Sequence, residues 1–450
     1  MSMETFGGKN AIVVGAGRSG FVAALVLLRE GARVTLFDER PKEAVEKTLG
    51  QAVPPQVAFV RGMLGAKAAS GADLVVVSPG VPVEKLPREA LRRAGTPLWG
   101  ELELGYRRFR GQVAAVAGTN GKSTVTTLLG EMASRAFGRV FVGGNLGTPL
   151  AAGAGEPYDW GVVEVSSFQL ETIEAFRPRV AVLLNITEDH RDRYRDFAAY
   201  AAAKMAVFRN QGPGDAAVVN ADDPEVAARA GAIPSERIPF SIARSLDAGI
   251  FLAGGDMVLR AGGTEERYPR ALLKIAGMHN VENAMAAIAA ARRMGVPPAA
   301  VREALAAFRG LPHRVELVRS VGGVAYYNDS KGTNVGAVLK CLEGFQEPVV
   351  LIAGGKDKGI DFRPLREPLR RKARAAVLLG EARERMEREL AGAVPLEAAG
   401  SLAEAVRAAA ALARPGDVVL FSPACSSFDM FRNFEERGEA FREAVKGLPG

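Results

Sequence analysis

The chain has 450 residues, which is too long for a single hydrophobic core and predicts two to four domains of about 100–200 residues each. Hydrophobic residues make up 48% of the chain and charged residues 24%, values near the globular average that exclude an intrinsically disordered protein. The net charge of +7 is spread over 58 basic and 51 acidic residues, and its densest clusters, YRRFR and REPLRRKAR, look like solvated helix faces rather than a nucleic-acid-binding stripe.

The N-terminus and the cysteines favour a cytoplasmic protein. MSMETFGGKN has no basic region followed by an apolar one, and the early apolar run FVAALVLL is too short to span a membrane. Cys341 and Cys425 are too few for a disulfide framework, which fits a reducing compartment. We interpret both as small, partly buried side chains, and we expect neither a signal peptide nor a membrane span.

Short β-branched runs alternate with Ala- and Leu-rich helical stretches along the whole chain. This alternation predicts an α/β fold of parallel sheets with helices on both faces. The predicted strands are NAIVVGAG, RVTLFDE, DLVVVSPG, VAAVAGTN, WGVVEVSS, VAVLLNIT, PVVLIAGG, AAVLLGEA and DVVLFSPA. Breaks at AGTPLWG and FRGLPHR predict three domains, 1–100, 101–310 and 311–450.

The first predicted strand runs into a glycine-rich turn. Gly15, Gly17 and Gly20 form G-x-G-x-x-G between a strand and a helix, and Asp38 closes the next strand at the spacing of a ribose contact. Taken alone, this motif favours an NAD-dependent oxidoreductase. The alternative is that the glycines serve only the tight turn.

The stretch GTNGKST follows a strand and precedes a helix, as a phosphate-binding loop requires, although Val116 replaces the first glycine of the usual pattern. Backbone N–H groups at the helix N-terminus can cradle phosphates, and Lys122 can reach the terminal ones. Ser123 or Thr124 can bind Mg²⁺. The alternative, a chance Gly-Lys-Ser turn, explains neither this context nor the motifs downstream.

A carboxylate and an imidazole end neighbouring predicted strands. Glu164 in EVSSFQLE and His190 in NITEDHRDRY are suited to hold a hard cation beside the phosphate loop. Glu164 is alternatively an N-terminal helix charge, and His190 a hydrogen-bonded loop residue, although we favour a site role for His190. For His279 and His313 we weigh a site role and a structural role equally.

The last third of the chain carries YNDSKGTN, AGGKDKG and FSPACSSFDMFRNFEERG. Asp329, Lys331, Thr333 and Lys358 offer donors and a carboxylate from glycine-flanked loops, as expected where an anionic amino acid meets a nucleotide. Each motif taken alone is also compatible with a turn that carries solvated charges.

In this order, the motifs GTNGKST, EVSSFQLE, ITEDHRDRY, AAAKMAVF, GMHNVENA, HRVE, NDSKGTN, GGKDKG and SPACSSFD…NFEERG resemble the Mur ligases of peptidoglycan synthesis. The resemblance covers essentially the whole chain. It implies an N-terminal Rossmann-like domain that binds the UDP substrate, a central P-loop ATPase-like parallel sheet that binds ATP, and a C-terminal Rossmann-like domain that binds the amino acid. SSFQLE, NDSK-x-TN and SPACSSFD favour the member that adds D-glutamate to UDP-N-acetylmuramoyl-L-alanine through an acyl phosphate.

The resemblance also implies functional residues. The catalytic set is Lys122, Glu164, His190 and Lys204, and two Mg²⁺ ions are implied at Ser123, Glu164, His190 and a carbamylated Lys204. The implied ATP contacts are Gly118, Thr119, Asn120, Gly121, Lys122, Ser123, Thr124, Asn280, Asn283, Arg314 and Asp329. The implied UDP-substrate contacts are Gly17, Ser19, Asp38, Arg40, Ser78, Gly80 and Asn145. The implied D-glutamate contacts are Lys331, Thr333, Lys358, Ser427 and Phe434.

On this interpretation the partners are small molecules only, namely ATP, UDP-N-acetylmuramoyl-L-alanine and D-glutamate. The chain then acts as a cytoplasmic monomer without nucleic acid, and the glycine-rich turn needs no NAD. Three alternatives stay open at this point: an NAD-dependent oxidoreductase, a P-loop regulatory switch that hydrolyses nucleotide, and another Mur ligase with a different amino-acid specificity.

Overall fold

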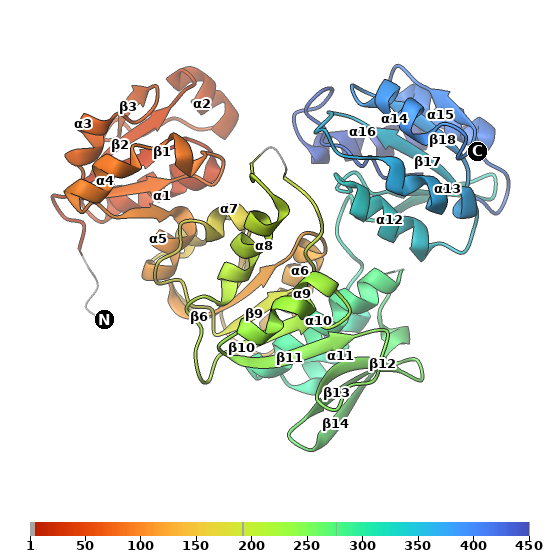
Figure 1. Cartoon of the computed structure of the whole chain (residues 1–450), viewed down its shortest axis with the longest axis horizontal. Coiled ribbons are helices and arrows are strands. Elements are labelled where there is room, and N and C mark those ends of the chain that lie inside the picture. The colour runs from red at the N-terminus through yellow and green to blue at the C-terminus, as the bar shows by residue number, and fades with distance from the viewer. Residues whose placement is uncertain (1–4, 191–192, 276, 450) are drawn as a thin grey trace.

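The computed structural model describes residues 5–190, 193–275 and 277–449. It contains three separate β-sheets that follow one another along the chain, each flanked by helices (Figure 1). The N-terminal and C-terminal domains lie apart from each other, and each adjoins the central domain. The predicted α/β class with three domains is confirmed.

The N-terminal sheet has the strand order β3-β2-β1-β4-β5 and is parallel throughout. Its apolar strands are buried between two hydrophobic clusters, one on each face of the sheet. The strands are β1 (Asn10–Val14), β2 (Arg33–Asp38), β3 (Ala58–Arg61), β4 (Leu74–Val77) and β5 (Leu98–Gly100). The helices are α1 (Arg18–Arg29), α2 (Lys42–Leu49), α3 (Ala66–Ser70) and α4 (Arg88–Ala94).

The central sheet has the order β14-β13-β12-β11-β10-β9-β6-β8-β7, and hydrophobic clusters cover both faces. Its strands are β6 (Arg110–Ala117), β7 (Val140–Gly144), β8 (Pro157–Glu164), β9 (Val180–Leu183), β10 (Ala216–Asn220), β11 (Glu236–Ser241), β12 (Gly249–Ala253), β13 (Asp256–Ala261) and β14 (Thr264–Pro269). Its helices are α5 (Glu101–Arg108), α6 (Lys122–Ser134), α7 (Ser167–Leu170), α8 (Phe197–Met205), α9 (Pro224–Arg229), α10 (Met278–Met294) and α11 (Pro298–Ala307). Because β6 pairs with both β8 and β9 in parallel, the carboxyl ends of these three strands meet at one edge.

The C-terminal sheet has the order β15-β16-β20-β17-β18-β19 and also carries a hydrophobic cluster on each face. Its strands are β15 (Glu316–Val321), β16 (Val324–Asn328), β17 (Val349–Gly354), β18 (Ala373–Leu379), β19 (Leu396–Ala398) and β20 (Val418–Phe421). Its helices are α12 (Val335–Gly344), α13 (Arg366–Lys372), α14 (Arg383–Leu390), α15 (Leu402–Leu412) and α16 (Phe434–Lys446).

Two antiparallel segments depart from the predicted parallel sheets. Strands β12, β13 and β14 pair as an antiparallel meander, and β15 pairs antiparallel with β16. Each hairpin turns on a Gly-Gly pair, at residues 254–255, 262–263 and 322–323, and every one of these glycines has positive φ. Two consecutive residues with positive φ are what a type I′ hairpin turn requires, so the glycine pairs direct these reversals.

Arg108 corrects one interpretation of the sequence. Its side chain is only 6% exposed, because α5 packs against α1 where the chain enters the central domain. Its Nε donates to the two carboxylate oxygens of Glu30 at 2.9 and 2.8 Å, and its guanidinium lies 4.4 Å from the ring centroid of Phe6. The interpretation of YRRFR as a solvated face is therefore wrong for this residue, which joins two domains.

The linker between the central and C-terminal domains is held in an unusual backbone conformation. His313 has a φ of 62° and Val315 a φ of 45°, and they flank Arg314. The ring Nδ1 of His313 lies 3.0 Å from Nδ2 of Asn328, and the His313 carbonyl accepts a hydrogen bond from the N–H of Lys331 at 3.1 Å. The linker is thus attached to the C-terminal domain close to its contact with the central one.

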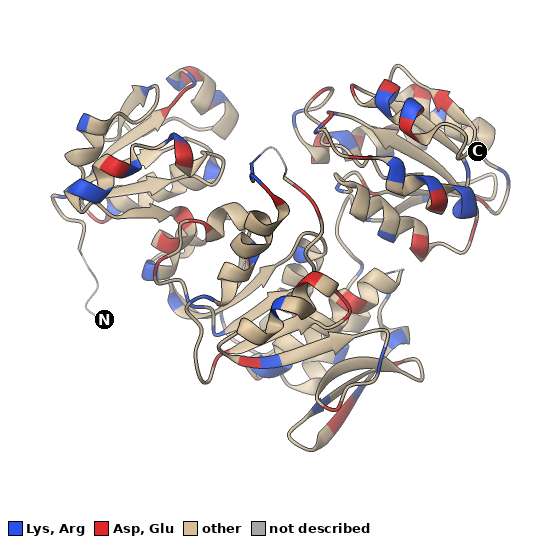
Figure 2. Ribbon diagram, in the orientation of Figure 1, with Lys and Arg blue, Asp and Glu red and all other residues tan. Residues whose placement is uncertain are grey.

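Basic and acidic residues are mixed within each domain in the part of the chain that the structure describes. Figure 2 shows basic and acidic residues interspersed over all three domains. Within the described part of the chain, no helix combines the length and apolarity that crossing a membrane requires.

We expect Gly20→Ala to destabilise the N-terminal domain. A Cβ at Gly20 would lie 1.9 Å from the carbonyl oxygen of Gly15, a clash that requires α1 to move away from β1. Overpacking of this kind lowers the free energy of unfolding by about 1–3 kcal/mol. Thermal denaturation with Gly17→Ala as the matched control checks this, because a Cβ at Gly17 meets Ser78 Oγ at an ordinary 3.8 Å. Equal stability of the two variants would contradict the prediction.

Candidate active site

A cavity of about 220 Å³ lies between the carboxyl edge of the central sheet and the C-terminal domain. Its walls come from the phosphate loop, the ends of β8 and β9, the start of α10, the interdomain linker, the 329–341 segment and Lys358. Most of the residues implied for ATP therefore face those implied for the amino acid across one space.

Asn185, which closely follows β9, holds the phosphate loop in place through hydrogen bonds to its backbone. The side-chain Oδ1 of Asn185 accepts hydrogen bonds from the backbone N–H groups of Thr119 and Asn120 at 3.1 and 2.8 Å. Gly121 has a φ of 87°, and a Cβ there would lie 2.3 Å from Asn283 Oδ1, so both the backbone and the contact with α10 favour glycine. The loop is therefore positioned by close contacts with two neighbouring elements.

Lys122 is the first residue of α6, and its ammonium folds back over the loop. Its Nζ donates to the carbonyl oxygens of Gly118 and Thr119 at 3.0 and 2.9 Å. Burial lowers the pKa of Lys122, while the charge of Glu164 opposes that shift. The start of a 13-residue helix and a lysine thus meet at one point, an arrangement suited to anionic phosphates.

Glu164 ends β8 with both carboxylate oxygens engaged. Ser123 Oγ donates to Oε2 at 2.6 Å, and Asn145 Nδ2 donates to Oε1 at 2.7 Å. Burial raises the pKa of Glu164, but the nearby charge of Lys122 and these two hydrogen bonds outweigh it and leave the pKa lowered. The carboxylate is therefore held in its charged form.

His190 lines the cavity, whereas Lys204 is buried and does not. His190 lines it, with a φ of 53°, and its ring centroid lies 4.8 Å from that of Phe168. Lys204 is 3% exposed, is not among the cavity-lining residues, and donates from Nζ to Gly118 O at 2.8 Å. Burial, followed by the charge of Lys122, lowers the pKa of Lys204 well below its usual value.

The cavity is also lined by Asn280 and Asn283 of α10, Arg314 of the linker and Asp329 after β16. Arg314 Nη2 reaches Ser123 Oγ at 3.4 Å, which joins the linker to α6. Burial raises the pKa of Asp329 to about 6, and its Oδ2 accepts from Ser422 Oγ at 2.7 Å.

His279 also lines the cavity, next to Asn280 in the chain. Burial, followed by the charges of Lys340 and Arg314, lowers the pKa of His279 to about 4, so its imidazole is neutral at pH 7. The structure therefore places this histidine beside the candidate nucleotide site in its uncharged form.

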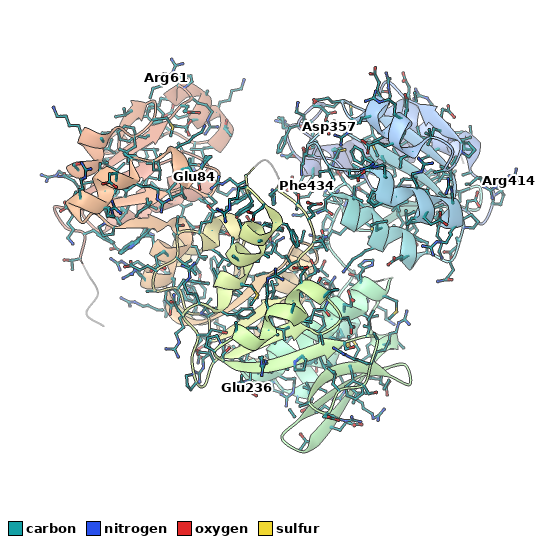
Figure 3. The ribbon with its side chains drawn as sticks, in the orientation of Figure 1. Arg61, Glu84, Glu236, Asp357, Arg414 and Phe434 are labelled. Atoms are coloured by element: carbon teal, nitrogen blue, oxygen red, sulfur yellow. The ribbon has the colours of Figure 1, made fainter. Side chains whose placement is uncertain are left out.

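Lys331, Thr333 and Lys358 line the side of the cavity formed by the C-terminal domain. Lys331 Nζ lies 4.2 Å from the ring centroid of Phe434. Burial lowers the pKa of Lys331 to about 8. Phe434 itself lies on the side of the C-terminal domain that is nearest to the other two domains (Figure 3). Ser427 and Phe434 are not among the residues that line the cavity.

A second cavity, of about 340 Å³, lies at the carboxyl edge of the N-terminal sheet. Among the residues implied for the UDP substrate, Ser19 and Asn145 do not line it, whereas the others do: Gly17, Asp38, Arg40, Ser78 and Gly80. The distance of 2.7 Å between Asn145 and Glu164 places Asn145 at the first cavity instead.

The carboxylate of Asp38 is fully engaged within the protein. It accepts from the N–H of Ala16 at 2.8 Å, from the N–H of Arg40 at 2.9 Å, and from Nε and Nη2 of Arg40 at 2.8 and 2.9 Å. A carboxylate offers about four lone-pair positions, so this set uses them all. The geometry gives no support to Asp38 as a free acceptor for a cofactor ribose.

Four polar residues that line the first cavity were not predicted from the sequence, namely Asn185, Asp189, Asn334 and Lys340. Asn185 had a signal, because a polar residue at the end of a buried strand often faces a ligand edge. Asp189, Asn334 and Lys340 each make a contact that forms only where the two domains meet, and no neighbouring residue in the sequence indicates it. Lys340 Nζ lies 3.4 Å from Glu282 Oε2 in the central domain, for example.

The donor set fits a nucleotide-bound Mg²⁺ ion better than an all-protein metal centre. Among the residues that the structure describes, no three His, Cys, Asp or Glu side chains gather as a metal-binding group. Ser123 and Glu164 do place a hydroxyl and a carboxylate beside the start of α6. Mg²⁺ is commonly bound by one or two carboxylates together with substrate phosphates, which matches this sparse set.

Comparison with known proteins finds three family matches in chain order. They are the Mur ligase MurD-like N-terminal domain at residues 9–100, the Mur ligase middle domain at 116–291 and the glutamate ligase domain of Mur ligases at 313–425. A UDP-N-acetylmuramoylalanine–D-glutamate ligase of Geobacter metallireducens is 49% identical over 443 residues, 98% of each chain.

Solved structures with a similar fold include two from Thermotoga maritima. UDP-N-acetylmuramate-alanine ligase MurC has a TM-score of 0.60 at 20% identity. The match covers 97% of the present chain and 99% of the MurC chain. MurF ligase in complex with ADP has a TM-score of 0.60 at 18% identity. The match covers 99% of the present chain and 97% of the MurF chain.

Proposed function

The chain belongs to the Mur ligase family, and from this we propose how its residues carry out the ligation. It is an ATP-dependent ligase that adds D-glutamate to UDP-N-acetylmuramoyl-L-alanine in peptidoglycan synthesis. One observation carries the assignment of residues: the phosphate loop and the three polar side chains Lys331, Thr333 and Lys358 open onto the same cavity.

In the first step, the carboxylate of the L-alanyl group attacks the γ-phosphorus of ATP in line, giving an acyl phosphate and ADP. This transfer depends mainly on positioning and on neutralising the charge of the phosphoryl group. Lys122 and the N–H groups at the start of α6 hold the phosphates, and Arg314 adds a second positive charge from the linker.

In the second step, the uncharged amine of D-glutamate attacks the acyl carbon. The tetrahedral intermediate loses phosphate, and the amine proton is released as the amide forms. Lys331 and Lys358 are placed to bind the carboxylates of the incoming amino acid, because both are cationic side chains on the cavity wall. Ser427 and Phe434 lie outside that wall. We propose that Phe434 acts on this subsite through Lys331, which it contacts, and the assignment of Ser427 rests on the family resemblance.

ATP and Mg²⁺ are the cofactors of this family, and Mg²⁺ supplies charge neutralisation for the phosphoryl transfer. We propose that Ser123 and Glu164 hold one ion beside the loop, and that His190 and a carbamylated Lys204 hold a second one. Asn145, which donates to Glu164, fixes the orientation of that carboxylate.

The environment of Lys204 suits carbamylation. Carbamylation joins a neutral amine to CO₂ with loss of one proton, and the lowered pKa of Lys204 favours the neutral amine. We expect Lys204→Ala to lose about 10²-fold or more in kcat, the scale for removal of one transition-state stabiliser. Kinetics with and without CO₂ check this: the parent should lose activity when CO₂ is removed and regain it on addition. Activity of Lys204→Ala equal to that of the parent would exclude the role.

We assign the substrate subsites to the three domains as 1–100, 101–310 and 311–450. The UDP end of the substrate takes the cavity at the N-terminal sheet, where Arg40, oriented by Asp38, offers the charge for a diphosphate. The chain is proposed to work in the cytoplasm as a monomer, since its substrates are soluble small molecules.

Release of ADP in the presence of UDP-N-acetylmuramoyl-L-alanine and each of D-Glu, L-Glu, L-Ala and a diamino acid tests the function. We expect turnover with D-Glu alone. Turnover with another amino acid but not D-Glu would overturn the specificity, and phosphate release without the UDP substrate would favour a nucleotide switch. A fluorescence titration with NADH serves as the control for an oxidoreductase and should show no binding.

A further inference from the structure

Asn334 bridges two domains at the phosphate loop. It precedes α12 in the C-terminal domain, is 5% exposed, and its Oδ1 caps the helix by accepting from the N–H of Ala337 at 2.8 Å. Its Nδ2 donates to Asn120 Oδ1 at 3.3 Å and to Asp189 Oδ2 at 3.0 Å, both in the central domain. We call these three side chains the Asn334 bridge.

The orientation of the Asn334 amide follows from its partners. The oxygen must face Ala337, because a backbone N–H needs an acceptor, and the nitrogen must face the Asp189 carboxylate, which offers only acceptors. An amide N–H that donates to a carboxylate forms one of the stronger hydrogen bonds.

Both partners of Asn334 belong to the reaction centre. Asn120 is part of the phosphate loop and is held by Asn185, while Asp189 adjoins His190 in the chain. On its own side of the bridge, Asn334 directly follows Thr333, whose carbonyl lies 3.4 Å from Lys358 Nζ. The bridge therefore connects the phosphate loop to the candidate amino-acid subsite through a short series of contacts.

We propose that Asn334 is a positioning residue for the ligation. By bonding Asn120 and Asp189 at once, it sets the distance between the phosphate loop and the loop that carries Lys331 and Thr333. This inference rests on the proposed function, since it concerns the approach of the amine to the acyl phosphate. Asn334 and Asp189 belong to none of the implied binding sets, whereas Asn120 belongs to the implied ATP set.

The two roles of Asn334 can be separated by substitution. Asn334→Ser keeps a helix cap, because serine caps helices as well as asparagine does, but its short side chain cannot span to Asp189. Asn334→Asp also keeps the cap, yet it removes the donor and places a negative charge against Asp189. Ser401→Ala, which removes the cap of α15 in the same domain away from the cavity, shows the effect of a lost cap alone.

We expect kcat/KM for ATP to fall about tenfold in Asn334→Ser and about 100-fold in Asn334→Asp, because hydrogen bonds to charged groups and like-charge contacts have effects of this size. Thermal midpoints of both should stay near that of the parent. Asn334→Asp combined with Asp189→Asn should recover at least about tenfold over Asn334→Asp, since the donor and acceptor are exchanged. Parental activity in Asn334→Ser, or no recovery in the double variant, would overturn the proposal.

Small-angle scattering with ADP and Mg²⁺ tests the bridge without the ligase reaction. The radius of gyration of Asn334→Asp should exceed that of the parent, while Ser401→Ala should match the parent. Equal radii for Asn334→Asp and the parent would contradict the bridge. If scattering separates the variants while the parent fails to use D-glutamate, the proposed function fails and the bridge stands.

Discussion

Lys122→Ala is expected to lose about 10³-fold or more in kcat, a larger loss than we expect from Lys204→Ala. Phosphoryl transfer depends on charge neutralisation, and single phosphate-stabilising cations contribute on the order of 10³-fold or more. Lys122 is the cation at the start of α6, and its Nζ already lies over the loop at 3.0 Å from Gly118 O. Its removal leaves the loop backbone intact but takes away the charge that the phosphates meet.

Pre-steady-state measurement of ADP formation checks this, because it isolates phosphoryl transfer from release of products. Lys122→Arg serves as a variant that keeps the charge and should retain more activity than Lys122→Ala. Lys274→Ala, a change at an exposed lysine of the same domain, should leave the rate unchanged. Near-parental ADP formation by Lys122→Ala would remove Lys122 from the catalytic set.

Glu164→Gln is expected to lose about 10²- to 10³-fold in kcat, with a higher Mg²⁺ concentration required for half-maximal rate. The substitution keeps the shape of the side chain but removes the negative charge that Mg²⁺ needs, and metal-ion stabilisation accounts for several kcal/mol of a barrier. Ser123 and Asn145 both donate to this carboxylate, so the glutamine also faces two donors with a single acceptor oxygen.

Initial rates over a Mg²⁺ titration test this role of Glu164. Glu225→Gln, in the partly exposed pair with Arg229 on α9, is the matched control and should give the parental Mg²⁺ curve. If Glu164→Gln lowers kcat without any shift in the Mg²⁺ curve, Glu164 acts on the phosphate loop and not as a metal ligand.

The alternating strands and the loop motifs were predictable because their signals are local. Val116 lies inside β6 and the loop begins two residues later at Gly118, so the glycine that the usual pattern places at position 116 falls within a strand here. The three Gly-Gly hairpins also had a local signal, since paired glycines between apolar runs favour type I′ turns. None of the predicted strands covered residues 249–269 or 316–328, so these hairpins were missed.

Contacts between domains were not predictable in the same way. Arg108 was interpreted as solvated because nothing near it in sequence indicates Glu30, which lies 78 positions away. Asn334 caps α12 through a residue three positions away, which the local sequence can indicate. Its bridge partners in the central domain lie 214 and 145 positions away, and nothing in the local sequence indicates them. The roles assigned to Lys204, Ser427 and Phe434 stay predictions, because they came from the family resemblance and depend on ligands.

The backbone of the linker has a consequence for the end of the reaction cycle. Val315 is β-branched and has a φ of 45°, a conformation that costs about 1–3 kcal/mol wherever the surrounding structure imposes it. Its neighbour Arg314 reaches across to α6, so we expect the segment to relax when the nucleotide departs and the two domains separate. The linker that holds the two domains in contact would then also favour the release of products. Val315 would speed turnover because its strained backbone makes the closed arrangement of the domains less stable.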